Sequence, residues 1–216
     1  MINVLIADDH HLVRTSIAHL LNEEIDIKVI GEVDDGETAV NQCRQLKPDI
    51  VLMDIRMPGI GGLEATRRIH RSQADVKVII LTAHLEDNVL RRMLEAGASG
   101  FLSKGADALE MTDAIRQVFR NGRYISQEIA QRLALAHFSD EESPFGQLSD
   151  RELQIALMIV NCQRVQDISD RLHLSPKTVN TYRYRLFNKL KVTSDVELTH
   201  LALRHGMVDG FDASEG

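Results

Sequence analysis

Three aspartates stand at the ends of apolar runs in the first half of the chain. Asp8 and Asp9 come directly after the run Ile2–Ala7. Asp54 comes directly after the run Ile50–Met53. Two carboxylates about 4 Å apart repel each other by ~4 kcal/mol at an effective dielectric constant of about 20, so three that converge require a cation or a proton. Carboxylate oxygens, with water and backbone oxygens, suit Mg²⁺, which prefers octahedral oxygen coordination. The simpler alternative is that each aspartate only caps a strand and stays solvated.

Two further polar side chains, Thr82 and Lys104, end later apolar runs, VKVIILT and GFLSK. If these runs are parallel strands, their carboxyl ends meet at one edge of the sheet, where ligand sites form in open α/β sheets. The aspartates, the hydroxyl and the ammonium would then share one crevice. Taken singly, Thr82 would be an ordinary strand-end residue and Lys104 a solvated loop lysine.

The order of apolar and amphipathic segments predicts the elements that position these side chains. Short apolar runs alternate with longer segments in which apolar residues recur every three or four positions, which favours a parallel sheet with helices on both faces. We expect a flavodoxin-like α/β domain over residues 1–122, with five strands in the order 2-1-3-4-5. The expected strands are Ile2–Ala7, Ile27–Val33, Ile50–Met53, Val76–Leu81 and Gly100–Leu102. The expected helices are Leu12–Leu21, Glu37–Leu46, Leu63–His70, Asp87–Ala96 and Ala106–Phe119.

A polar, acidic and proline-containing stretch separates this domain from a second one. We interpret residues 123–146 as a linker, with a short helix at 126–137. For residues 147–209 the pattern of helix signals predicts an all-α domain of four helices. We interpret residues 210–216 as a tail. Ser149 and Ser194 each begin a capping box. Ser175 is an N-cap followed by proline, which is favoured at the first helical position.

The third of these helices is cationic. Residues 176–191 contain five basic side chains and no acid, and Val179, Tyr182, Leu186 and Leu190 form an apolar stripe at helical spacing. A short preceding helix and a tight turn predict helix-turn-helix, whose second helix enters the major groove of DNA. A solvated charged face is the alternative for the helix taken alone. Charge supports different partners for the two domains: residues 1–146 have a net charge of −7 and residues 147–209 of +2.

The length and composition of the chain fit two soluble domains. The chain has 216 residues, of which 44% are hydrophobic and 26% charged, and no apolar run approaches the ~20 residues that a membrane span needs. The early charges of Asp8 and Asp9 argue against a signal peptide. Cys43 and Cys162 are far apart, which favours a reducing, cytoplasmic location, and we expect both to be packed as small apolar residues.

His10 and His11 beside the aspartates raise the alternative of a transition-metal site, since imidazole suits zinc or iron. We do not favour it, because adjacent side chains point in different directions and no other histidine has ligand spacing.

The segments DDH, VLMDIRMPG, LTA and GFLSKG, in this order, resemble the receiver domain of bacterial two-component response regulators. The resemblance implies that Asp54 accepts a phosphoryl group from a sensor histidine kinase. It also implies that Mg²⁺ is bound by Asp9, Asp54 and the backbone carbonyl of Arg56, with Asp8 assisting through water.

Two more roles follow from the same resemblance. Lys104 would pair with phosphoryl oxygens, while Thr82 and Phe101 would act as the switch. Phe101 stands where many receivers have tyrosine, so a phenol hydroxyl is absent. Arg56 and His84, two residues beyond Asp54 and Thr82, are expected to tune how long the phosphoryl group persists.

Residues 147–209 resemble the LuxR-type helix-turn-helix domain, and the whole chain resembles the NarL/FixJ group of response regulators. This second resemblance implies base-edge contacts from Asn180, Thr181 and Tyr184. It places Lys177, Thr178, Arg185 and Lys189 nearer the phosphates of promoter DNA. The small positive charge predicts weak binding by one copy, so we expect a homodimer on two half-sites, without membrane association.

Two other functions remain open at this point. One is a DNA-binding regulator whose receiver works without phosphorylation, although none of Asp9, Asp54, Thr82 and Lys104 is missing. The other is an aspartyl-phosphate hydrolase, which would be an enzyme rather than a regulator; no Asp-x-Asp follows the first strand and no substrate cap is visible.

Overall fold

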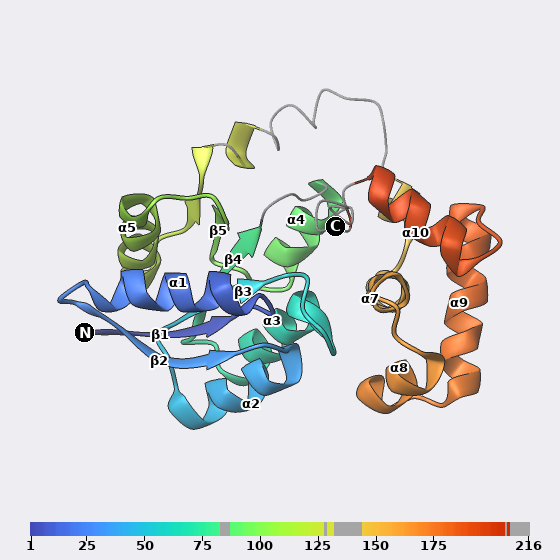
Figure 1. Cartoon of the computed structure of the whole chain (residues 1–216), viewed down its shortest axis with the longest axis horizontal. Coiled ribbons are helices and arrows are strands. Elements are labelled where there is room, and N and C mark those ends of the chain that lie inside the picture. The colour runs from blue at the N-terminus through green and yellow to red at the C-terminus, as the bar shows by residue number, and fades with distance from the viewer. Residues whose placement is uncertain (83–86, 128, 132–143, 206, 208–216) are drawn as a thin grey trace, which may run out of the picture. The chain divides into compact units, whose positions relative to one another are not determined.

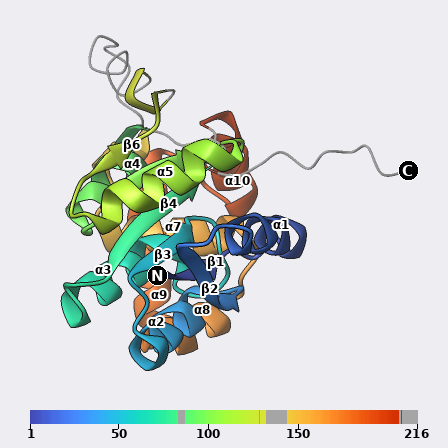
Figure 2. The same cartoon turned by 90° about the vertical axis from the view of Figure 1, so that its left-hand side faces the viewer.

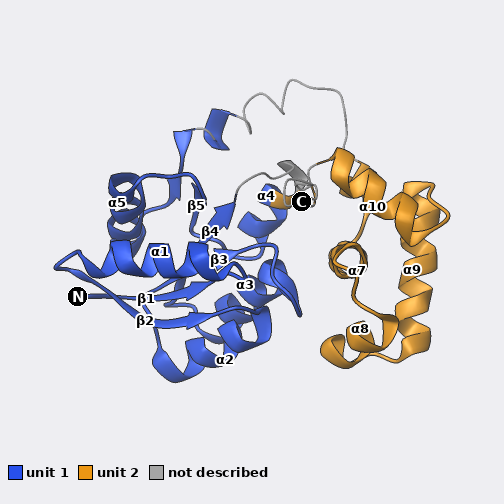
Figure 3. Ribbon diagram, in the orientation of Figure 1, with its two compact units in different colours: residues 1–83, 90–140 blue, residues 84–89, 141–216 orange. Residues whose placement is uncertain are grey.

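The computed structural model describes residues 1–82, 87–127, 129–131, 144–205 and 207. The chain divides into two compact units (Figure 3): the first has residues 1–83 and 90–140, and the second has residues 84–89 and 141–216. The first unit contains a parallel sheet and the second contains helices. Within the described part of the chain, no helix combines the length and apolar character needed to cross a bilayer.

Among the described residues, the sheet of the first unit has six parallel strands in the order β2-β1-β3-β4-β5-β6 (Figure 1). They are β1 (Ile2–Ala7), β2 (Ile27–Val33), β3 (Ile50–Asp54), β4 (Lys77–Thr82), β5 (Gly100–Ser103) and β6 (Tyr124–Ile125). The predicted α/β class and the order of the first five strands are confirmed. The sixth strand was missed, because two residues are too few to show a strand period.

Helices cover both faces of the sheet, with α1 and α5 on one face and α2 and α3 on the other (Figures 1 and 2). The helices are α1 (His11–Asn22), α2 (Gly36–Leu46), α3 (Gly61–Ser72), α4 (Asp87–Glu95) and α5 (Ala108–Phe119). Ile17 and Leu21 of α1 and Ile115 of α5 pack with Ile50 and Leu52 of β3 in one core. Because β3 is covered on both faces, every residue from Ile50 to Asp54 is buried, which explains the uninterrupted apolar run.

The second unit has the four predicted helices. A 3-10 turn, η1 (Pro144–Gln147), precedes α7 (Asp150–Val160), α8 (Val165–Leu172), α9 (Pro176–Leu190) and α10 (Asp195–Arg204). The side chains of Ser149, Ser175 and Ser194 each accept a hydrogen bond from a backbone N–H three residues on, as expected of N-caps. Part of the predicted stripe on α9 needs correction, because Tyr182 is only half-buried whereas Phe187 is buried.

The two cysteines differ. Cys43 is fully buried on α2, and burial raises the pKa of its thiol to about 11, as fits the predicted packed residue. Cys162, in contrast, is exposed, so its prediction as a packed residue was wrong. It has a positive φ of 57° just after α7, and this left-handed turn leaves its side chain outside the core.

The segment between the two predicted domains is described only in part. Gln127 and residues 129–131 are helical, within the short helix expected at 126–137, and residues 132–137 lie outside the described residues. The domain boundaries at 122, 147 and 209 stay predictions.

Candidate functional site

The carboxyl ends of β1 and β3 bring the three aspartates together. Ala7 of β1 is paired with Met53 of β3, so the residues that follow them lie side by side. Asp8 is fully buried and Asp54 is 3% exposed. One ligand atom from each of Asp8, Asp9, His10 and Asp54 lies within 4.8 Å of the others.

Lys104, which follows β5, connects two of these carboxylates. Its Nζ lies 2.8 Å from Asp8 Oδ2 and 2.9 Å from Asp54 Oδ2. Burial raises the pKa of Asp54, and the attraction of Lys104 opposes this effect. Burial also disfavours the charged Lys104, but the two carboxylates outweigh it, so the pKa of Lys104 is raised. Lys104 therefore neutralises part of the negative charge collected at the strand ends.

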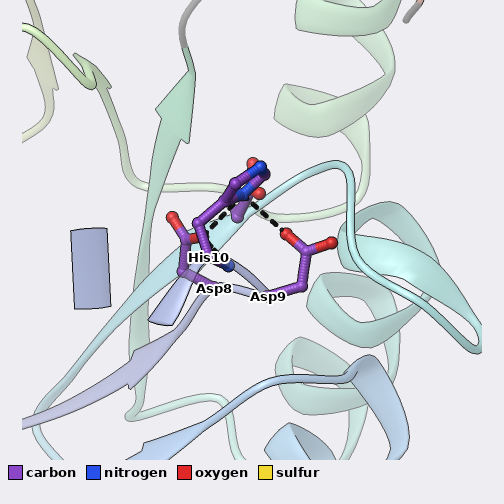
Figure 4. Close-up of side chains that lie close together, drawn as sticks. Asp8, Asp9 and His10 are labelled. Atoms are coloured by element: carbon purple, nitrogen blue, oxygen red, sulfur yellow. Dashed lines mark hydrogen bonds and ion pairs between the residues drawn. The ribbon is translucent and has the colours of Figure 1, made fainter. Parts of the chain in front are cut away.

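His10 joins this cluster (Figure 4), although the sequence did not favour a histidine at the site. Its Nδ1 lies 2.9 Å from Asp9 Oδ1 and 3.2 Å from Asp8 Oδ1, and its backbone N–H donates to Asp8 Oδ1 at 2.8 Å. Burial raises the pKa of Asp9, against the attraction of His10. His11 begins α1 and is exposed, and among the described residues it is not part of the group whose ligand atoms converge, whereas His10 is.

Thr82 and Phe101 lie on the neighbouring strands β4 and β5. Thr82, at the end of β4, is 7% exposed and pairs with Ser103, and its carbonyl accepts a hydrogen bond from Lys104 N at 2.8 Å. Phe101 is fully buried in β5. The backbone thus connects Thr82 to the lysine that contacts Asp54, and places the aromatic ring of Phe101 inside the domain.

Of the two residues expected to tune the site, the structure describes one. The backbone N–H of Arg56 donates to Asp54 Oδ1 at 3.3 Å, and the Arg56 side chain is half-buried. His84 lies outside the described residues.

The chemistry of the donor set fits a hard divalent cation. Asp8, Asp9 and Asp54 bring carboxylate oxygens close together, and these are the ligands that Mg²⁺ prefers. Asp8, which is expected to assist the cation through water, is in direct ionic contact with Lys104. Its role in this structure is to share the ammonium with Asp54.

On α9, most of the predicted DNA-contacting side chains form one accessible surface. Tyr184 is 72% exposed, and Lys177, Thr181 and Arg185 are also exposed. Asn180 is half-buried, as is Thr178, whose hydroxyl lies 2.8 Å from the hydroxyl of the N-cap Ser175. The Thr181 hydroxyl donates to the Lys177 carbonyl at 2.9 Å, so it offers a partner mainly its remaining acceptor capacity.

Lys189 differs from the other predicted DNA-contacting residues because its ammonium group binds other residues of the second unit. Its Nζ lies 2.6 Å from Glu152 Oε2 on α7 and 3.2 Å from the carbonyl of Gln147. Ser149 N–H also donates to Glu152 Oε2, at 2.7 Å. Lys189 therefore joins α9 to the capping box of α7.

This arrangement predicts that the second unit loses stability in acid. Burial alone would raise the pKa of Glu152, but the hydrogen bonds from Lys189 and Ser149 outweigh it and the pKa is lowered. A carboxyl group with a lowered pKa stabilises the fold above its unfolded-state pKa of ~4.3, and this contribution is lost as pH falls through the folded-state value. Hydrogen exchange of the α7 and α9 amides should show the loss. Glu152→Gln should remove about 1–2 kcal/mol at pH 7 and weaken the pH dependence; an undiminished pH dependence in this variant would contradict the assignment.

Comparison with known proteins identifies both units. The family described as response regulator receiver domain matches residues 4–116, and the family described as bacterial regulatory proteins, luxR family, matches residues 146–202. With the parallel sheet and the helix-turn-helix unit, these matches show that the chain belongs to the LuxR-type response regulators of two-component systems. It is a phosphorylation-controlled transcription regulator.

Among individual proteins, the chain is similar over nearly its full length to two named regulators. It is 59% identical to the response regulator GacA of Pseudomonas aeruginosa over 211 residues, which are 97% of this chain and 99% of that protein. It is 57% identical to the response regulator UvrY of Escherichia coli over 209 residues, 96% of each chain.

Solved structures agree. A LuxR-family response regulator from Aurantimonas sp. is 33% identical, with a TM-score of 0.61, and the match covers 64% of this chain and 99% of that one. RcsB from Salmonella enterica, bound to the promoter rprA, has a TM-score of 0.71 over 93% of this chain and 98% of its own; at 22% identity it supports the fold alone.

Proposed function

We propose that Asp54 is the residue that a sensor histidine kinase phosphorylates. A carboxylate oxygen of Asp54 attacks the phosphorus, the bond from phosphorus to the kinase histidine breaks, and an acyl phosphate forms. The observation that carries the proposal is the contact of one ammonium, Lys104, with both buried carboxylates, Asp8 and Asp54. This arrangement keeps a negatively charged acceptor at the sheet edge and supplies a cation that can pair with phosphoryl oxygens.

Asp9, Asp54 and the backbone carbonyl of Arg56 would hold Mg²⁺, with Asp8 beside them. When bound, the cation would offset charge that develops on the transferred phosphoryl group. Such electrostatic stabilisation, with positioning of the reactants, accounts for most of the catalysis of phosphoryl transfer. The Arg56 N–H and the Lys104 ammonium orient the Asp54 carboxylate from two sides.

Phosphorylation adds about −1.5 to −2 charges at this edge. We propose that Lys104 then pairs with the phosphoryl group, that Thr82 donates its hydroxyl to it, and that Phe101 repacks in response. Arg56 and His84 would tune the lifetime of the acyl phosphate. Apart from such self-dephosphorylation, we assign no catalytic activity to the chain.

In the second unit we propose that α9 enters the major groove of promoter DNA. Asn180, Thr181 and Tyr184 would contact base edges, with Lys177, Thr178, Arg185 and Lys189 nearer phosphates. Lys189 is the weakest member of this set, since Glu152 already binds it. Phosphorylation would free this unit or bring two copies together as a homodimer. A protein that binds promoter DNA in this way would work in the cytoplasm.

The test combines acetyl phosphate with Mg²⁺ on the full chain. We expect one acyl phosphate, mapped to Asp54 by reduction with borohydride and mass spectrometry, and no labelling when EDTA removes the cation. Affinity for pooled promoter fragments and the oligomeric state should change with labelling. Labelling at another residue would overturn the phosphoacceptor assignment. Unaltered DNA affinity would favour the phosphorylation-independent receiver, and repeated turnover of small phosphoesters would favour the hydrolase.

Asn180→Ala is expected to weaken binding to promoter fragments selected by the wild type about 5-fold to 150-fold. An asparagine can bond adenine through two hydrogen bonds, and each such pair discriminates by ~1–3 kcal/mol. Binding to random DNA should change little, because base contacts supply specificity and phosphate contacts do not. Fluorescence anisotropy on both kinds of DNA measures the ratio. Asn161→Ala, an exposed asparagine after α7, is the control; an equal loss on both DNAs in Asn180→Ala would contradict the base contact.

A further inference from the structure

We propose that Glu37 is a positioning residue for the metal site, because its carboxylate holds the loop that carries the backbone carbonyl of Arg56. The inference rests on the proposed function, in which that carbonyl is a metal ligand. Glu37 lies in the first turn of α2, and nothing in its sequence context points to the strand end at Asp54.

Two hydrogen bonds in opposite directions join the start of α2 to this loop. Oε2 of Glu37 accepts from the backbone N–H of Ile60 at 3.1 Å. The backbone N–H of Gly36 donates to the carbonyl of Pro58 at 3.4 Å. The negative charge of Glu37 is favoured in this position, because the N-terminus of a helix carries a partial positive charge. The carboxylate is therefore held by its own helix while it binds the loop.

Gly59 shows that the loop is shaped around this carboxylate. Its φ is +82°, a conformation that side chains rarely adopt, and a Cβ atom built on it would lie 1.8 Å from Oε2 of Glu37. Glu37 thus occupies the space that the missing side chain leaves. Gly59 itself is buried.

The other end of the loop is fixed against β3. The backbone N–H of Gly62 donates to the carbonyl of Ile55 at 3.0 Å, and a Cβ atom on Gly62 would lie 2.2 Å from the carbonyl oxygen of Asp54. Arg56 lies between these two anchors. If Glu37 is removed, its hydrogen bond to Ile60 N–H is lost and the loop is held less firmly, so the carbonyl of Arg56 samples more positions. Ordering this carbonyl when Mg²⁺ binds costs conformational entropy, and this cost lowers the affinity for Mg²⁺.

The test is the dissociation constant of Mg²⁺, measured by isothermal titration calorimetry on the unphosphorylated full chain. Glu37→Ala is expected to raise it about tenfold, the lower end of what outer residues around metal sites contribute. Glu37→Asp keeps the charge but lacks the reach to Ile60, so it should behave like the alanine variant. Glu37→Gln keeps an oxygen acceptor without the charge and should recover most of the affinity. Glu64→Ala is the matched control, because it removes an equal charge from α3, where Glu64 pairs with Arg67 and Arg68.

A second readout separates positioning from a general loss of structure. Phosphoryl incorporation from acetyl phosphate should fall in Glu37→Asp at low Mg²⁺ and return to within about twofold of the wild type at saturating Mg²⁺. Unchanged Mg²⁺ affinity in Glu37→Asp, or a loss of affinity in Glu64→Ala as large as that in Glu37→Ala, would overturn the inference while leaving the proposed function intact. If Asp54→Asn bound Mg²⁺ as tightly as the wild type, the proposed metal site itself would fail, and the inference with it.

Discussion

Asp54→Asn is expected to abolish phosphoryl incorporation and to leave the protein at least as stable as the wild type. The amide of asparagine has no carboxylate oxygen to attack phosphorus, so the acyl phosphate cannot form. The substitution also removes one of two carboxylates that are buried together, and burial already raises the pKa of Asp54. Lys104 keeps its contact with Asp8 at 2.8 Å. Neutralising a buried charge without leaving its partner unpaired should change the free energy of unfolding by zero to about +2 kcal/mol.

Two measurements check this prediction on the same preparation. Labelling with acetyl phosphate and Mg²⁺ reports the acceptor, and urea unfolding without metal reports stability. Asp75→Asn, which changes an exposed carboxylate, should label and unfold as the wild type does. Labelling of Asp54→Asn at the wild-type rate would refute the assignment, and a loss of several kcal/mol would refute the electrostatic account of the site.

Lys104→Met should have the opposite effect on stability. The side chain of Lys104 is 17% exposed and contacts the side chains of Asp8 and Asp54, which are almost fully buried. Removing the ammonium leaves Asp8 and Asp54 close together without its charge, and loss of one partner from a buried ionic group destabilises by about 3–5 kcal/mol. Mg²⁺ should restore much of this loss, because a divalent cation would offset the same carboxylates, and a ligand that binds only the folded state stabilises it.

The decisive quantity is the gain in unfolding free energy on adding Mg²⁺, which should be larger in Lys104→Met than in the wild type. Lys28→Met, an exposed lysine on β2, serves as the control and should match the wild type with and without the cation. A stability loss below about 1 kcal/mol, or an equal gain with Mg²⁺ in both proteins, would show that Lys104 does not neutralise the aspartates.

The sequence predicted the sheet well because its central strands are buried on both faces. Continuous apolar runs such as Ile50–Met53 are typical of strands that helices cover on both sides, and the N-caps at Ser149 and Ser175 determine where helices start. The two-residue β6 could not be predicted in this way. It exists because Tyr124 pairs with Gly100, a partner far away in the sequence.

In the candidate site, too, some residues could be predicted from the sequence pattern and others could not. The convergence of Asp8, Asp9 and Asp54 follows from the strand order of a flavodoxin-like sheet, the fold that the alternating apolar and amphipathic segments favour. The contribution of His10 depends on how the chain turns between β1 and α1, and that of Glu37 depends on a loop built around a glycine of positive φ. Neither segment shows a repeating pattern of apolar residues from which its conformation could be predicted.

The pairing of β6 with β5 has a consequence for how a signal could leave the receiver. Ile125 is in register with Phe101, and the backbone N–H of Ser126 donates to the carbonyl of Phe101 at 3.0 Å. The first residues of the connection toward the helix-turn-helix unit are thus part of the same hydrogen-bonded ladder as the buried aromatic. A displacement of the Phe101 backbone must move these residues or break that bond. The first residues of the connection are therefore coupled directly to β5 through backbone hydrogen bonds.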